Sequence, residues 1–376
     1  MLGLDDQMSR DHDWGCRLTL LVDQDARDQV PRISQMLEEG LPERFGEFPV
    51  RFPVTWDSAV SHQIEVATVT EFAASRLGAD PTGGLSVLDW LSVTGQSVLE
   101  VTAGPVFTDR TRTLAAVRTL LAWYPPDVER YVLAAGWQRL CQSLQMVGRT
   151  AETGDELGSR LLSARLAADL LGLAFSLSRR WAPYAKWRGT AFRSLPVAAR
   201  LGPQLDAAAA PGWRERENAL ATACEVLLSI QREQGHPAPG SAVIPFFDRP
   251  YRTVDQQVPQ GLIAAITDPM LHGCRPWWAR LSSGPTALMS CPAQPAARPC
   301  RRLTGPGPAQ DDDTTHLDEG VDESASIARP GPDTFAAQAR RRMILVDARS
   351  MVRPVGRVGL EPRPADYGTK PRRRWR

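Results

Sequence analysis

The sequence lacks most of the patterns that identify a cofactor or metal site. Its six cysteines are scattered without a CxxC pair, which argues against a zinc knuckle or a disulfide framework. Neither a P-loop nor a dinucleotide fingerprint is present. Histidines number only five, and no Ser or Cys has an evident partner base, so a catalytic triad is not indicated.

The sequence also has no large excess of one charge and no long apolar run. The formal net charge is +1, so no overall field attracts anionic partners, and we do not expect long nucleic acid among them. No apolar run reaches the roughly 18 residues of a membrane helix, and no secretory signal is visible, so we expect no membrane association. The unpaired cysteines favour a reducing, cytoplasmic location.

Lysine is nearly absent, since Lys186 and Lys370 are the only lysines among 44 basic residues. A chain so rich in Arg and Ala is typical of GC-rich DNA, which indicates a bacterial gene. Lys186 lies in the aromatic stretch WAPYAKWRG, beside Tyr184. A lysine is a good point charge for a phosphate. The alternative is an exposed basic residue at the start of a helix.

The residue patterns predict an α+β fold in three parts. Residues 1–110 read as an α/β domain, residues 111–272 as a helical domain and residues 273–376 as a mostly disordered tail. In the first part we expect strands at 16–23 and 62–69, an edge strand or extended loop at 48–54, and helices at 25–40 and 70–78. In the second part we expect helices at 113–125, 126–148, 155–181 and 212–235.

The tail admits more than one interpretation. It is rich in proline and carries an acidic run, QDDDTTHLDEGVDE, and only RRMILVDARSMV keeps an apolar pattern. It is either a solvated, disordered segment or sequence that was not selected for folding, such as an out-of-frame translation of GC-rich DNA. Its charge runs alternatively mark a segment that binds nucleic acid or a partner.

Two aspartates, Asp11 and Asp13, precede the strand expected at 16–23. Residues i and i+2 of an extended chain share a face, so their carboxylates can project together. Such a pair suits Mg²⁺, which prefers oxygen ligands and leaves room for phosphates. Glu65, in the apolar stretch HQIEVATV, is the candidate for a third carboxylate, because burying it without a partner is costly. Alternatively, Glu65 points to a solvent face of its strand.

These segments resemble a known superfamily. The stretch LGLDDQMSRDHDWG, the apolar strand after it and HQIEVATV look like the polymerase-beta-type nucleotidyltransferases. More narrowly, they are similar to a bacterial, actinobacterial-type family of unknown function that joins such a domain to a helical one. LEVTAGPVFTD (99–109), LAWYPPDVERYVLAAGWQRL (121–140) and RRWAPYAKWRGTAFRSLP (179–196) are among the further similar segments. The resemblance covers roughly residues 2–270.

The resemblance implies a mixed β-sheet and Mg²⁺-dependent transfer of a nucleoside monophosphate from an NTP to an unknown acceptor. Two Mg²⁺ ions would lie on Asp11, Asp13 and Glu65, which would be both the metal ligands and the catalytic carboxylates. Lys186, with Tyr184 beside it, would face the triphosphate from the helical domain.

One element of the superfamily pattern is not found. A Gly-Ser pair at the start of a helix, about ten residues ahead of the DxD pair, normally cradles the triphosphate. Here Gly3 is followed by Leu4, and the pair Gly158–Ser159 comes after the DxD pair. Either the start site is assigned too late or the gene is truncated at its N-terminal part, and we expect weak or no transferase activity from the chain as written. The alternative function is that of a non-catalytic remnant that binds nucleotide or a partner protein through the helical domain.

Overall fold

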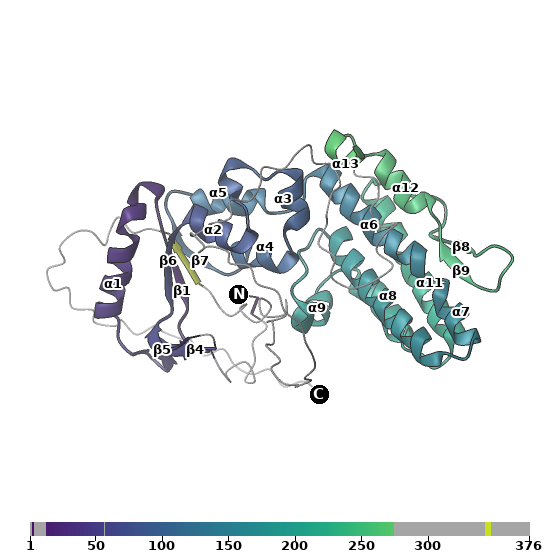
Figure 1. Cartoon of the computed structure of the whole chain (residues 1–376), viewed down its shortest axis with the longest axis horizontal. Helices are drawn as coiled ribbons and strands as arrows, with labels where there is room; N and C mark the ends of the chain where they lie inside the picture. Colours follow the sequence, from purple (N-terminus) through teal and green to yellow (C-terminus); the bar gives the residue numbers. More distant parts are fainter. Residues whose placement is uncertain (1, 4–12, 56, 274–342, 347–376) are drawn as a thin grey trace, which may run out of the picture.

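The fold was analysed in a computed structural model, which describes residues 2–3, 13–55 and 57–273 and one further strand at 343–346. The molecule is elongated, with an α/β half and a helical half along its long axis (Figure 1). The predicted α+β fold with a helical region after the sheet is therefore confirmed. The predicted boundaries at 110 and 272 stay a prediction.

The largest sheet has four strands in the order β6-β1-β10-β7. Its strands are β6 (Ile64–Thr68), β1 (Leu18–Val22), β10 (Met343–Val346) and β7 (Val106–Asp109). All three strand pairs are parallel, whereas the resemblance implies a mixed sheet. Among the described strands, antiparallel pairing occurs in separate two-stranded ribbons. Parallel strands are covered on both faces and therefore read as apolar runs, which fits the sequence LTLLV of β1.

Six described elements lie between β1 and β6 along the chain. They are η2 (Gln24–Gln29), α1 (Val30–Gly40), β2 (Arg44–Phe45), β3 (Phe48–Pro49), β4 (Arg51–Val54) and β5 (Asp57–His62). The helix predicted at 25–40 is thus a 3-10 turn followed by an α-helix that has a proline in its first turn. The stretch 48–54 supplies strands β3 and β4, which belong to two antiparallel ribbons, β2-β3 and β4-β5.

The two faces of the sheet pack against different helices. Leu20 and Val22 of β1 form a small core with Ile33 of α1. Leu21 points to the opposite face, where it joins a larger core with Phe72, because successive residues of a strand alternate between faces. The helices on this second face are α2 (Val69–Leu77), α3 (Val87–Ser92), α4 (Gly95–Thr102) and α5 (Thr113–Leu120), with the 3-10 turn η3 (Pro81–Gly83) between α2 and α3.

Local signals fix the ends of α2. Thr68 caps its first turn and forms a capping box with Glu71, in which each side chain bonds the backbone N–H of the other residue. Gly78 ends the helix with φ 75°, a left-handed conformation that glycine adopts without strain. The predicted stop at Gly78 is therefore confirmed.

The helical half has its own core, which is built mainly from long helices. Its elements are α6 (Pro126–Ser143), α7 (Met146–Glu152), α8 (Glu156–Leu177), α9 (Ala185–Phe192), α10 (Ala198–Ala207), α11 (Trp213–Glu233), β8 (Val243–Pro245), β9 (Arg252–Val254), α12 (Gln257–Ala264) and α13 (Pro269–Gly273). Trp137 of α6 lies fully buried at its centre and donates a hydrogen bond to Gln231 Oε1 of α11.

Two further sequence-based expectations differ from the structure. The helix predicted at 126–148 is broken into α6 and α7 around Gln145. This break lets Gly148 pack against Trp213 and Tyr251, where a Cβ atom would lie 2.7 Å from each ring. In the predicted tail, Met343–Val346 forms strand β10. The rest of 274–376 lies outside the described residues.

Candidate functional site

Strand pairing brings Glu65 beside β1, as the sequence predicts for a neighbouring strand. β6 pairs in parallel with β1, and Glu65 lies opposite Thr19. Ile64 and Val66 pack toward α1, so Glu65 points to the other face of the sheet. The predicted alternative, a solvent-facing Glu65, is therefore wrong, because α2 covers this face and contributes a partner.

That partner is Arg76, which sequence reasoning missed. An Nη of Arg76 lies 2.6 Å from Glu65 Oε2, and the Arg76 and Glu65 side chains are 9% and 28% exposed. The Thr19 hydroxyl is 3.5 Å from the same carboxylate oxygen. The Arg76 guanidinium also stacks on the Phe72 ring, 4.5 Å from its centroid. Glu65 is therefore held in a fixed position by a largely buried arginine.

Asp13 lies ahead of β1 in a compact turn. Its backbone has φ 53°, a left-handed conformation that Asp tolerates better than most residues. Its Oδ1 accepts a hydrogen bond from the Thr55 N–H and its Oδ2 accepts one from the Thr55 hydroxyl, each at 2.6 Å. The rule that i and i+2 share a face, which requires an extended chain, therefore does not hold at Asp13. Asp11 lies outside the described residues.

Gly15 explains why this turn packs so closely on the neighbouring ribbon. A Cβ atom at Gly15 would lie 2.3 Å from the Phe52 ring and 2.6 Å from the Pro49 carbonyl oxygen. The next N–H along the chain, that of Cys16, donates to the same carbonyl at 2.8 Å. Only glycine fits at this position, so the sequence WGC fixes the approach of residues 13–17 to β3 and β4.

Glu100 of α4 is a second carboxylate close to Arg76, and sequence reasoning also missed it. Burial raises the pKa of the Glu100 carboxyl above its usual range, and the neighbouring Glu65 charge raises it further. The Gln96 hydrogen bond and the Arg76 charge act in the opposite direction. The signal in the sequence was the one used for Glu65, because Glu100 lies between Leu99 and Val101 in an apolar stretch.

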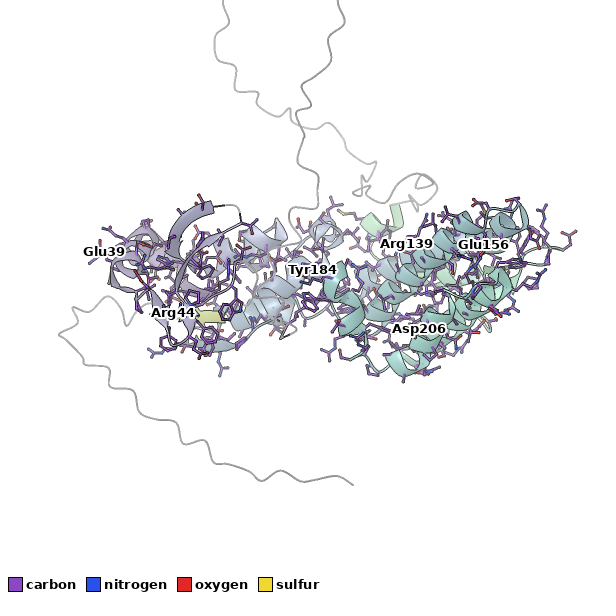
Figure 2. The ribbon with its side chains drawn as sticks, turned by 90° about the horizontal axis from the view of Figure 1, so that it is seen from below. Glu39, Arg44, Arg139, Glu156, Tyr184 and Asp206 are labelled. Carbon is purple, nitrogen blue, oxygen red and sulfur yellow. The ribbon has the colours of Figure 1, made fainter. Side chains whose placement is uncertain are left out.

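A chain of polar contacts links this group to the predicted residue Tyr184. Gln96 Nε2 donates to Glu100 Oε1 at 3.3 Å, and Gln96 Oε1 accepts from the Tyr184 N–H at 3.2 Å. Figure 2 shows Tyr184 between the α/β half and the helical half of the molecule. The structure thus connects Glu100 and Tyr184 through Gln96, while the Arg76 charge acts on both Glu65 and Glu100.

Close backbone packing keeps Gln96 next to Tyr184. Gly95 begins α4, and a Cβ atom there would lie 2.4 Å from the Ala182 carbonyl oxygen. Thr94 caps the same helix and forms a capping box with Ser97. The start of α4 therefore lies directly against the segment 178–184, with no room for a side chain between them.

A buried carboxylate, Glu129 of α6, anchors the other end of segment 178–184. Arg179 donates to both of its oxygens, from Nε at 2.7 Å and from an Nη at 2.9 Å. Trp123 Nε1 donates to Glu129 Oε1 at 2.7 Å. Trp181 then stacks on Trp123, with 4.7 Å between ring centroids. Together these contacts fix the path of the chain toward Tyr184.

Lys186 is exposed at the start of α9. Its Nζ lies 5.0 Å from the centroid of the Trp187 ring, a cation–π contact that leaves the ammonium accessible to solvent. The alternative offered by the sequence, an exposed basic residue at a helix start, describes its position. Its predicted contact with a phosphate stays a prediction.

The donor chemistry of Asp13 and Glu65 suits Mg²⁺, because both present carboxylate oxygens. In the arrangement described, however, protein donors orient both carboxylates, Thr55 for Asp13 and Arg76 for Glu65. Within residues 2–3, 13–55, 57–273 and 343–346, no group of three or more His, Cys, Asp or Glu side chains could hold a metal ion. Asp11 is not among these residues, so the predicted set of three stays a prediction.

None of the helices in the described part of the chain has both the length and the apolar character needed to cross a bilayer.

Comparison with known families gives one match. A family model described as "Domain of unknown function (DUF4037)" matches residues 90–188, so the predicted relation to a family of unknown function is confirmed for this region. The match includes Glu100, Tyr184 and Lys186 and excludes Asp11, Asp13 and Glu65. No curated protein and no solved structure matches the chain.

Proposed function

We propose that this chain is a nucleotidyltransferase-like protein of a bacterial cell that transfers, at the weak rate expected from its sequence, a nucleoside monophosphate from an NTP to an acceptor hydroxyl. The supporting observation is the parallel pairing of β6 with β1, in which Glu65 lies opposite Thr19 on the strand that follows Asp11 and Asp13. This is the neighbouring-strand relation that the resemblance requires of its third carboxylate. The acceptor is not assigned, because a fold alone does not select one.

In the proposed reaction the acceptor oxygen attacks the α-phosphorus of the NTP. The bond from this phosphorus to the oxygen that bridges the α- and β-phosphates breaks, and pyrophosphate leaves. Glu65 takes the proton of the acceptor hydroxyl. Two Mg²⁺ ions, when bound to Asp11, Asp13 and Glu65, would neutralise the phosphate charge. Arg76 holds the Glu65 carboxylate in place, and Lys186 supplies a positive charge for the phosphates from α9.

Two buried cysteines of the helical half support a location for the reaction. Cys141 and Cys224 are buried free thiols in the helical half, as in proteins that fold in a reducing compartment. We therefore propose that the chain acts in the cytoplasm.

A specific observation favours the second candidate, a non-catalytic protein that binds nucleotide or a partner through its helical domain. Both oxygens of Asp13 accept hydrogen bonds from Thr55, and Glu65 is paired with Arg76. Carboxylates satisfied in this way serve the fold without a metal. The two candidates differ in turnover, and binding alone does not separate them.

The decisive experiment measures binding and turnover on the same protein. The full chain is titrated with each NTP, with and without Mg²⁺, and pyrophosphate release is followed with water or the chain itself as acceptor. We expect Glu65→Gln to reduce release by about 100-fold or more, while the dissociation constant for Mg²⁺–NTP changes less than tenfold. Asp13→Asn should weaken the Mg²⁺ dependence of binding.

Asp169→Asn is the matched control, because Asp169 is also a carboxylate paired with an arginine, Arg139, at 2.8 Å in the helical half. This variant should behave as the wild type. Binding without pyrophosphate release would favour the non-catalytic candidate. The absence of both Mg²⁺-dependent binding and release would refute the transferase proposal.

A further inference from the structure

The helical half contains a pocket that the proposed reaction does not use. It has a volume of about 410 Å³ and lies between α8, α10 and the start of α11, lined by Arg160, Ala164, Ala167, Leu205, Ala208 and Arg216 among others. Figure 2 labels Glu156 and Asp206, which belong to the two helices on either side of it. Arg160 and Ala164 are exposed, so the pocket opens to the surface.

One side of this pocket carries excess positive charge. Glu156 Oε1 lies 3.2 Å from Arg160 Nε and 2.7 Å from an Nη of Arg216. Two guanidinium groups therefore share one carboxylate, which leaves one positive charge at the pocket. An anionic group of a ligand can neutralise this charge, and a carboxylate suits the planar guanidinium donors.

Arg216 is an unusual residue to line a pocket, because its side chain is completely buried. Its Nη atoms donate to the carbonyls of Ala210 and Pro211 and to the Ser159 hydroxyl. Its Nε is buried and has no acceptor among the residues that the structure describes. A buried donor without an acceptor costs free energy, and the buried guanidinium adds its positive charge to that of Arg160 at this side of the pocket.

The remaining walls are apolar and small. Ala164 and Ala167 of α8 face Leu205 and Ala208 of the α10 region, and alanines at these positions create the hollow that larger side chains would fill. The volume lies near the lower end of the range for small-molecule pockets. A triphosphate carries several charges and would find too few cations here, so this pocket is not the NTP site of the proposed reaction.

We propose that the pocket binds a small amphipathic carboxylate, with its anionic head group at the exposed Arg160, next to the buried charge of Arg216, and a short apolar body along the alanine walls. This inference does not depend on nucleotidyl transfer. A straight-chain carboxylate such as octanoate has this chemistry and serves as the probe.

Calorimetric titration of the full chain with octanoate and with octanol separates the charge from the apolar body. We expect octanoate to bind at least about tenfold more tightly than octanol, which corresponds to one charge-assisted contact. Arg160→Gln should weaken octanoate binding by about threefold to tenfold, because Arg160 is more than half exposed and solvent screens its charge. Arg165→Gln is the control for charge, since Arg165 is exposed on the same helix but does not line the pocket.

A second variant tests the pocket itself. Ala164→Trp should abolish octanoate binding by filling the space, while Ala199→Trp, at an exposed alanine of α10 outside the pocket, should leave it unchanged. Circular dichroism verifies that each variant is folded, and the exposure of both alanines makes misfolding a small risk. Equal affinity for octanol and octanoate, or unchanged octanoate binding in Ala164→Trp, would overturn the proposal.

Discussion

Replacing Glu129 by glutamine tests whether the buried carboxylate of α6 holds segment 178–184 in place. The Glu129 side chain is 5% exposed, and it accepts two hydrogen bonds from Arg179 and one from Trp123. Glutamine keeps the shape but loses the charge, and its amide NH₂ group would face an Arg179 donor. The substitution therefore removes the ion pair and creates a donor–donor contact in a buried place.

The expected cost follows from the exposure of the two partners. Breaking a fully buried pair costs about 3–5 kcal/mol, but Arg179 is 53% exposed and water can solvate it once it is released. We therefore expect Glu129→Gln to lower the free energy of unfolding by about 2–3 kcal/mol. For a folded region of this size the midpoint of thermal unfolding should fall by about 5–10 °C.

Thermal unfolding followed by tryptophan fluorescence is the suitable assay, because Trp123 and Trp181 stack beside this ion pair. Asp169→Asn is the control, because Asp169 is 18% exposed and accepts one hydrogen bond from Arg139, whereas Glu129 is 5% exposed and accepts three. Its expected cost is below about 1 kcal/mol. If Glu129→Gln shifts the midpoint no more than the control does, the carboxylate does not anchor the segment and the reasoning fails.

Three other predictions concern single residues. Gly95→Ala should lower the free energy of unfolding by about 1–3 kcal/mol, because the new Cβ would lie 2.4 Å from the Ala182 carbonyl oxygen. Gly172→Ala is the control, since a Cβ there has open space in α8, and it should be neutral or stabilising. Urea unfolding measures both variants. Burial lowers the pKa of His236, so as the pH falls below about 6.5 the unfolded chain takes up a proton first. The wild type should then lose more stability between pH 7.5 and 5.5 than His236→Asn does, and an equal loss would contradict this assignment. Burial also raises the pKa of the Cys141 thiol to about 12, so the thiol should not react in the native chain. Peptide mapping after brief iodoacetamide treatment should find Cys141 unmodified in the native chain and modified in urea. Rapid modification of the native chain would show that the thiol is accessible.

The sequence predicted those elements that have strong local signals. The apolar run before Asp23, the capping residues around α2 and the leucine spacing of α8 each specify one element without help from distant residues. The resemblance predicted that Glu65 lies on a strand next to the one that follows Asp13. The structure pairs these strands, β6 and β1, and places Glu65 opposite Thr19.

Other features depend on contacts that a sequence pattern does not contain. The pairing of Arg76 with Glu65 requires knowing that α2 folds back over the face of β6. The left-handed turn at Asp13 depends on Thr55, which is far along the chain. The break after α6 carries no Pro, and it accompanies the close packing of Gly148 on Trp213. Tertiary contacts outweigh local propensity at each of these positions.

Strand β10 has a consequence for the order in which the chain folds during synthesis. It lies between β1 and β7, so neither of these strands has its central partner until residues 343–346 have left the ribosome. At roughly 5–20 residues per second, this delay after β7 is on the order of ten seconds or more. The helical core needs no such distant segment and can form during this interval. Until then β1 has one unpaired edge beside its β6 partner and β7 has no partner among the described strands of this sheet, and unpaired strand edges are open to pairing with other chains.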